Sequence, residues 1–468
     1  MEPTQLWALS DEDFNSWRRE NDLKNLFDSF QRCLPHFDEW LKTYNFSIDF
    51  ILKTDKPGGF FYGEKETILV EDNNEIANRY FFVEIQDEKH DKDLKKIPKT
   101  ENVTDYRFIP YLQWAKLKTG DNSFLKSKYS DHGTFRVVTR TAPDSPELSN
   151  AIMVPGISLL KLGGVKIEMG LSPFRNLDFT DLDFLEIEGS EFWSRENSYY
   201  FASCRNLKFI DTDISFKNFY GCWFEKLDVL NSKFQGVRFF GCDIFGANFE
   251  NTKLFNIVIE ECSSNSFSFN RVEVDGLEYV PPSKEWHSGV ALTYQTIIDN
   301  YKRLRVLYQN NGHRREAGEA YYNERLYELK YLSKSLQIKW VFRIFKSKGF
   351  KYARPYLIEE YRKLSTVITG TISRYIWGFG ERPLRTIIAS LVIIFFFAII
   401  YLSSGIPALG GNIVESVYLS IIMFSTLGFG DYSLVQDSSL KIIMAFEALL
   451  GAFTYGLFIA GYANKSRY

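Results

Sequence analysis

The feature that most constrains the fold of this 468-residue chain is an apolar residue at every fifth position through its middle. An α-helix repeats every 3.6 residues and a β-strand every two, so neither element places such a series on one face. The series runs through Phe209, Ile214, Phe219, Phe224, Val229, Phe234, Phe239, Ile244, Phe249, Leu254 and Ile259. We therefore expect square coils with four five-residue sides, each side pointing one large residue toward the axis.

The same spacing continues upstream and carries a recognisable unit. Leu177, Leu182, Ile187 and Phe192 extend the series, which then breaks between Trp193 and Asn206. The triplets Thr180-Asp181-Leu182, Ala247-Asn248-Phe249 and Cys242-Asp243-Ile244 resemble the A-(D/N)-L-X-X unit of pentapeptide-repeat proteins. The resemblance implies a right-handed quadrilateral β-helix over residues 171–280.

Three cysteines follow the period of a complete coil. Cys222, Cys242 and Cys262 lie twenty residues apart, so we expect them to stack on one face of the solenoid. A metal or redox ladder is one interpretation. The interpretation that we favour is that each cysteine is a small core residue in a reducing compartment. We expect no metal site and no cofactor in this part of the chain.

Two apolar stretches near the C-terminus are long enough to cross a bilayer, which takes about 20 helical residues. No charged residue occurs between Thr386 and Val414, and Glu447 is the only one between Ile442 and Asn464. The apolar segment 414–424 between them is too short to cross. We therefore predict two spans, with a short helix at 414–424 and a re-entrant loop between them.

The segment after this short helix reads Thr426, Leu427, Gly428, Phe429, Gly430 and Asp431. A row of inward-pointing backbone carbonyls can replace the water around a cation in a narrow pore, and glycine permits the alternating backbone conformations required. TLGFGD resembles the T-V-G-Y-G-D signature of potassium channels. The resemblance implies a potassium-selective homotetramer in which residues 426–430 bind K⁺, Asp431 lies at the outer mouth and K⁺ is the only ion required.

The departures from that signature direct attention to the second span. Leu427 and Phe429 replace Val and Tyr, and Phe429 lacks the hydroxyl that could hydrogen-bond behind the filter. Some two-span channels have a glutamate in the pore helix, where this chain has Ile422. Because a carboxylate is costly in lipid, we hypothesise that Glu447 supports the filter instead.

Glycines in the second span have two interpretations. Gly451 and Gly456 resemble the glycine pair of the inner helix in two-span potassium channels, which implies a gating hinge. The alternative is that they only let helices approach closely. The same registration implies that Ala452, Tyr455 and Ile459 line the cavity.

Basic residues predict the orientation of the two spans. Arg374, Arg382 and Arg385 precede the first span and Lys465 and Arg467 follow the second, whereas Lys441 is the only basic residue between the spans. By the positive-inside rule both termini are cytosolic, in a multi-pass protein of the cell (inner) membrane.

Two further regions precede the predicted pore domain at 381–468. Residues 1–170 are expected to form an α+β cytosolic domain, helical over its first fifty residues, with strands at 60–70, 80–85 and 135–140. The histidines at 36, 90 and 132 are scattered, and no nucleophile–base, metal or phosphate motif occurs, so we expect no enzyme. Residues 281–380 are predicted to form a basic helical hairpin, with a turn at 310–313, and an interfacial linker.

The basic residues of this linker alternate with aromatic ones. The run contains Lys339, Arg343, Lys346, Lys348, Lys351 and Arg354 beside six Trp, Phe and Tyr residues. Nucleic acid is the interpretation we favour least, because a membrane span follows. Anionic lipid headgroups near residues 339–385 and ordinary packing between domains are the two alternatives.

The sequence therefore predicts a multidomain chain: an α+β domain, a β-helix, a helical linker and an all-α two-span pore domain. The function that we favour is a potassium channel gated or assembled by its cytosolic part, with an unidentified cytosolic ligand or protein as a partner. The alternative is a membrane-anchored pentapeptide-repeat interaction module with a non-conducting or weakly selective pore. Gly428→Ala discriminates between the two, because only the channel interpretation predicts that this substitution abolishes K⁺ flux.

Overall fold

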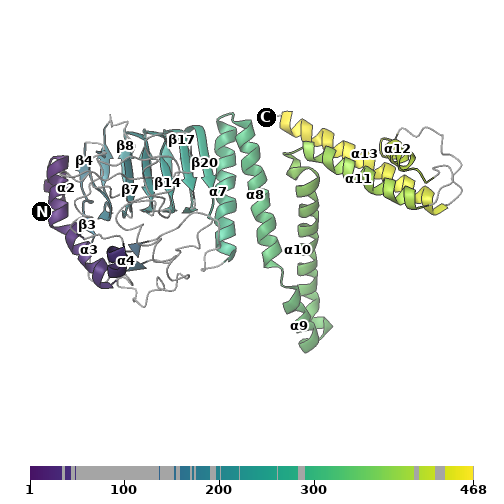
Figure 1. Cartoon of the computed structure of the whole chain (residues 1–468), viewed down its shortest axis with the longest axis horizontal. Helices are drawn as coiled ribbons and strands as arrows, with labels where there is room; N and C mark the ends of the chain where they lie inside the picture. Colours follow the sequence, from purple (N-terminus) through teal and green to yellow (C-terminus); the bar gives the residue numbers. More distant parts are fainter. Residues whose placement is uncertain are drawn as a thin grey trace. The chain divides into compact units, whose positions relative to one another are not determined.

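The computed structural model describes residues 1–33, 37–43, 48, 136–137, 152–153, 159–168, 171–172, 175–189, 197–200, 202–220, 222–260, 262–282, 290–404, 411–426 and 438–466. The chain forms two compact units, Met1–Trp286 and His287–Tyr468, which are described separately (Figure 1). The strands expected at 60–70 and 80–85 lie outside the described residues.

Four helices occupy the start of the first unit. They are α1 (Pro3–Trp7), α2 (Asp11–Glu20), α3 (Asp22–Cys33) and α4 (Phe37–Thr43). Helix α2 begins at the N-cap Ser10, whose hydroxyl accepts the amide of Asp13 at 3.1 Å, and three acidic residues in its first turn complement the helix dipole. Further on, β1 (Arg136–Val137) pairs antiparallel with β2 (Ile152–Met153).

A β-solenoid of about five turns follows these helices. Its strands are β3 (Leu160–Lys161), β4 (Lys166–Ile167), β5 (Thr180–Asp181), β6 (Glu186–Glu188), β7 (Asn197–Tyr200), β8 (Lys208–Ile210), β9 (Asp213–Ser215), β10 (Lys217–Tyr220), β11 (Trp223–Glu225), β12 (Asp228–Leu230), β13 (Lys233–Gln235), β14 (Arg238–Phe240), β15 (Asp243–Phe245), β16 (Asn248–Glu250), β17 (Lys253–Glu260), β18 (Ser263–Asn265), β19 (Ser268–Asn270) and β20 (Glu273–Val280). Neighbouring strands are parallel, and most paired residues are 20 apart, as Val229 and Phe249 are.

The register departs from this spacing at one step, where Ile187 pairs with Phe209, 22 residues later. The upstream series through Leu177, Leu182 and Ile187 therefore reaches the column of Phe209 only because the intervening coil contains two extra residues. The solenoid also begins earlier than the expected residue 171, since β3 pairs with β5 and β4 with β6. Its first coil thus includes a segment assigned by sequence to the N-terminal domain.

The solenoid core consists of large residues at every fifth position with small residues between them. The Phe219 ring stacks on Tyr199 and Phe239, with centroid distances of 5.2 Å and 5.3 Å. Cys204, Cys222, Cys242 and Cys262 are buried thiols, and within the described residues no cluster of potential ligands could hold a metal. Burial raises the pKa of the Cys204 and Cys242 thiols, which keeps them protonated and unreactive.

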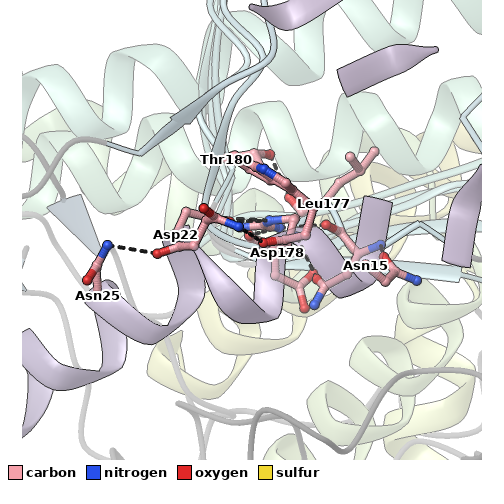
Figure 2. A network of polar contacts seen from close by, with 10 residues as sticks. Asn15, Asp22, Asn25, Leu177, Asp178 and Thr180 are labelled. Atoms are coloured by element: carbon pink, nitrogen blue, oxygen red, sulfur yellow. Dashed lines mark hydrogen bonds and ion pairs between the residues drawn. The ribbon is translucent and has the colours of Figure 1, made fainter. Parts of the chain in front are cut away.

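The N-terminal helices cover the first coil of the solenoid through polar contacts (Figure 2). Arg18 is fully buried, and its Nη1 donates to the carbonyl oxygens of Asn176 at 2.5 Å and Asp178 at 2.9 Å. Asp22 pairs with the same guanidinium at 2.6 Å, and the Asn15 amide oxygen accepts the backbone N–H of Asn176 at 2.8 Å. Helix α2 and the start of α3 therefore form a cap on the solenoid.

The second unit begins with a helical hairpin, α7 (Val290–Asn310) and α8 (Arg314–Ser335), which lie side by side in Figure 1. Gly312 adopts φ 76° in the turn between them. An ion pair of 2.9 Å between Arg305 and Glu324 and a stacked pair of rings, Tyr301 and Tyr327, join the helices.

The remaining helices of this unit are α9 (Ile338–Lys348), α10 (Phe350–Ile376), the 3₁₀ turn η4 (Gly378–Gly380), α11 (Leu384–Ser403), α12 (Ile413–Phe424) and α13 (Ser438–Ser466). Helix α10 packs against both α8 and α9. The three C-terminal helices pack against one another and form the candidate site.

Candidate pore domain

Helices α11 and α13 have the length and composition of membrane spans. The segments Leu384–Ser403 and Leu440–Ala463 have mean hydropathies of 2.6 and 1.9, and only 22% and 17% of them are buried within the single chain. Helix α12 has 12 residues and cannot cross a bilayer. Most of the apolar surface of both spans therefore requires lipid or further protein.

Helix α12 is anchored between the two spans. Asn412 caps its first turn by accepting the amide of Val414 at 2.9 Å. Leu419 is buried with Phe397 and Tyr401 of α11 and Leu440 of α13 in one apolar cluster. The short helix is thus fixed at its start and along one side.

Glu447 of α13 joins all three helices through its carboxyl group. The side chain is fully buried in the single chain. Ser420 of α12 donates its hydroxyl to one oxygen at 2.5 Å, and Tyr401 of α11 donates its hydroxyl to the other. Ser420 Oγ also lies 2.8 Å from the Ile394 carbonyl oxygen of α11. A carboxyl group buried among apolar helices is accommodated by such donors.

These contacts extend the sequence-based hypothesis for Glu447. Its partners Ser420 and Tyr401 were not identified from sequence. Two sequence features could have indicated them. A lone acidic residue in a span needs a buried hydrogen-bond donor, and Ser416 and Ser420 offer hydroxyl groups four residues apart in an apolar helix. Ile422, the position compared with the pore-helix glutamate of other channels, is buried and apolar.

The backbone leaves α12 abruptly at the first residue of the predicted filter. The amide of Ser425 still bonds to the Ile421 carbonyl at 2.9 Å, whereas Thr426 has φ 59°. A β-branched residue in the left-handed region is uncommon and ends the helix there. Leu427, Gly428, Phe429, Gly430 and Asp431 lie outside the described residues.

The three glycines of α13 have different surroundings. A Cβ on Gly451 would overlap the backbone carbonyl of Phe424, the last residue of α12, so the two helices touch at that point. At Gly461 a Cβ would lie 3.3 Å from Pro383. At Gly456 a Cβ would meet nothing within 4 Å. Close approach is therefore a sufficient reason for Gly451 in this structure, whereas Gly456 has no such reason within the single chain.

The predicted cavity residues lie on a different side of α13. Ala452, Tyr455 and Ile459 are exposed, with Tyr455 at 68% and Ile459 at 52%. Glu447, Gly451 and Thr454 form the buried side toward α11 and α12. The exposed set is thus available to face further copies or a water-filled space.

An elbow connects α10 to the first span and contacts α8 of the helical hairpin. Phe379 in η4 has φ 57°, and its ring lies 5.7 Å from that of Tyr322 in α8. The Arg382 guanidinium lies 3.9 Å over the Tyr322 ring and donates to Glu319 at 2.9 Å. Arg385 donates to the Tyr322 hydroxyl at 3.4 Å. Burial favours the neutral phenol, but the bond from Arg385 and its charge leave the pKa of Tyr322 below its usual value.

The same elbow contacts the end of α13. The Gly380 carbonyl oxygen would lie 3.5 Å from a Cβ on Gly461. A continuous set of contacts therefore runs from α8 through η4 to the C-terminal part of the second span. The sequence predicted an interfacial linker ending at residue 380 but not its contacts with α8 and α13.

Comparison with known families agrees with this arrangement. The sequence profile of the family described as "Ion channel" matches residues 387–466, which contain α12 and nearly all of α11 and α13. No curated protein and no solved structure matches the chain significantly. The C-terminal region is thus a two-span ion-channel domain in a membrane protein.

Proposed function

We propose that the chain is a subunit of a potassium-selective channel in which four copies surround one pore. Each copy supplies Thr426–Gly430 as one side of the filter, with Asp431 at the outer mouth. The observation that carries the proposal is the anchoring of α12 between two spans, with the TLGFGD sequence directly after it. A cation at the end of α12 is favoured by the partial negative charge of the helix C-terminus.

Gly428→Ala tests the proposal directly. The protein is reconstituted in liposomes, and K⁺ and Na⁺ efflux are measured separately. The wild type is expected to pass K⁺ and exclude Na⁺, and the variant to lose K⁺ efflux, because alanine resists the filter backbone. Ser403→Ala at the end of α11 is the control, because this side chain is exposed and its hydroxyl bonds to the Ile400 carbonyl of its own helix. Equal K⁺ and Na⁺ efflux by the wild type would favour the weakly selective alternative.

We also infer that the solenoid is a four-sided, right-handed β-helix of the pentapeptide-repeat type. The 20-residue offset between paired strands and the buried residue at every fifth position support this inference. Its uniform packing makes it a scaffold or docking face for a cytosolic partner. The distribution of basic residues supports an orientation with both termini in the cytosol, in a multi-pass protein of the cell (inner) membrane.

We propose that the cytosolic part controls the pore through the elbow. Tyr322 holds Arg382 and Arg385, which stand at the start of α11, and the elbow itself contacts Gly461 of α13. A displacement of the α7–α8 hairpin therefore shifts the cytosolic end of the second span, where a gate would close.

Substitution of Tyr322 tests this coupling. Tyr322→Leu removes the ring beneath Arg382 and is expected to change K⁺ efflux severalfold, whereas Tyr322→Phe keeps the ring and should have a smaller effect. Tyr321→Leu is the control, because that ring contacts Arg305 and Arg325 rather than the elbow residues. Unchanged efflux in Tyr322→Leu would contradict control through the elbow.

A further inference from the structure

Helix α10 carries an exposed apolar stripe along its length. Its members follow helical spacing, and all but the half-buried Leu357 are exposed: Phe350, Leu357, Tyr361, Ile368, Ile372 and Tyr375. Phe350, Tyr361 and Tyr375 are 62%, 70% and 66% exposed, which is unusual for large side chains in a soluble helix. The 27 residues of α10 extend over about 40 Å. This stripe, called here the α10 stripe, is a long apolar surface that stays largely uncovered in the single chain.

The side of α10 next to the stripe is already occupied. Ala353 and Glu360 are buried, and the Glu360 carboxylate accepts the Gln337 amide at 2.8 Å and pairs with Lys363 at 3.0 Å. A Cβ on Gly370 would lie 3.0 Å from Leu329 of α8. Packing on α8 and α9 therefore fixes the rotation of α10 and leaves the stripe outward.

Helix α9 continues the apolar surface and surrounds it with positive charge. Phe345 packs edge-on against Phe342 at 6.5 Å and against Phe350 at 6.4 Å, which joins the two helices into one aromatic corner. Between Ile338 and Ile358 the chain has six basic residues and no acidic residue. Within the described part of the chain, no ion pair joins Lys339, Arg343 or Lys346 to a carboxylate. The acidic Glu359 and Glu360 are held by Lys363.

We propose that the α10 stripe and the aromatic corner lie on the surface of the membrane, in contact with anionic phospholipid headgroups. Apolar and aromatic side chains enter the headgroup boundary, and basic residues beside them bind the lipid phosphates. Only seven residues, 377–383, separate α10 from the first span, so the stripe is tethered at the bilayer. Pairing of the stripe with the same surface of a second copy is disfavoured, because the six basic residues on each copy would repel one another.

The test places a nitroxide label on the full-length chain in lipid vesicles. Ile368→Cys carries the label within the stripe, and Thr366→Cys carries it on an exposed position of another side of α10, both in a Cys33→Ser background. The other four cysteines, Cys204, Cys222, Cys242 and Cys262, are buried and leave the background unlabelled. Collisions with oxygen report lipid, and collisions with a polar nickel complex report water.

We expect oxygen collisions to exceed nickel collisions severalfold at position 368, and the reverse at position 366. Nickel access at both positions would place the stripe in water and overturn the proposal. Loss of both kinds of collision at 368, with spin–spin broadening, would show instead that a second copy covers it. Neither reading depends on whether the pore conducts K⁺.

A second arm tests the headgroup chemistry. A label at Phe345→Cys is compared in phosphatidylcholine vesicles and in vesicles containing phosphatidylglycerol. We expect the label to be less mobile in the anionic vesicles than in phosphatidylcholine vesicles. We also expect its collisions with oxygen to be severalfold more frequent there. Adding K339Q/R343Q/K346Q to the labelled chain should remove this difference, while the other aromatic residues stay in place. Equal behaviour in both vesicle types would remove anionic lipid as the partner.

Discussion

In the solenoid, each core residue touches residues about one coil away, and a single chain buries the whole set. In the pore domain, one carboxyl group and one glycine hold three helices together, and most of the surface of the two spans stays apolar and exposed. The first region repeats one contact many times, so its stability is spread over many similar layers. The second concentrates its organisation in a few unique contacts and requires a bilayer or further copies to complete it.

The largest expected effect concerns Gly451. Gly451→Val places a branched side chain against the Phe424 carbonyl, so α13 cannot pass α12 and the pore domain should fail to assemble. K⁺ efflux should be lost, and size-exclusion chromatography should show no tetramer. Gly456→Val is the control within the single chain, since its Cβ position is open. Equal loss in both variants would show that contacts between copies, rather than the α12–α13 contact, decide assembly.

The solenoid should respond to core truncation with a large but local loss. Phe219→Ala removes a ring stacked between two others, and the cost is about 3–5 kcal/mol of unfolding free energy. Circular dichroism during urea unfolding measures it. Phe216→Ala serves as control, because that side chain is 40% exposed and its removal should change stability by about 0.5 kcal/mol or less. Equal losses would contradict the assigned register.

The buried network of Glu447 should show an intermediate effect. Tyr401→Phe leaves one carboxyl oxygen without its donor, at a cost of about 1–3 kcal/mol. Lower thermal stability of the assembled pore and faster loss of K⁺ current under sustained flux are expected. Ser416→Ala is matched to it, because Ser416 is equally buried in α12 but donates only to the Asn412 carbonyl. A Tyr401→Phe pore that behaves like wild type would remove the network from filter support.

The smallest effect belongs to the solenoid surface. Lys253 and Glu273 lie 3.0 Å apart on adjacent coils, and both side chains are more than half exposed. Lys253→Gln should lower the unfolding free energy by about 1 kcal/mol or less, and added salt should remove the difference. A larger loss would mean that the coils depend on individual surface pairs and that the contrast with the pore domain is weaker than described.

The two regions also differ in what their sequences disclose. A period of five needs only local pattern, so the solenoid and its core residues could be predicted. The two-residue shift before Phe209 could not, because a break in a pattern does not say how many residues loop out. The two spans and the short helix followed from hydropathy. The choice of Tyr401 and Ser420 as partners of Glu447 depends on the rotation of three helices about their axes, which composition does not specify.

The N-terminal cap was missed for a similar reason. Arg18 lies in an ordinary amphipathic helix, and its carbonyl partners lie about 160 residues later in sequence. Nothing within the helix indicates a target at that distance. The filter residues from Leu427 to Asp431 remain a sequence-based prediction.

The N-terminal cap affects whether the ends of neighbouring solenoids can associate. An uncovered solenoid end offers a row of backbone hydrogen-bonding groups, and such an end can join to that of a neighbour and grow into a fibre. Copies tethered to one membrane assembly experience effective concentrations in the millimolar range, where weak end-to-end joining becomes significant. By engaging the carbonyls of Asn176 and Asp178, Arg18 covers one end of the solenoid, and in the proposed tetramer this would keep neighbouring copies separate.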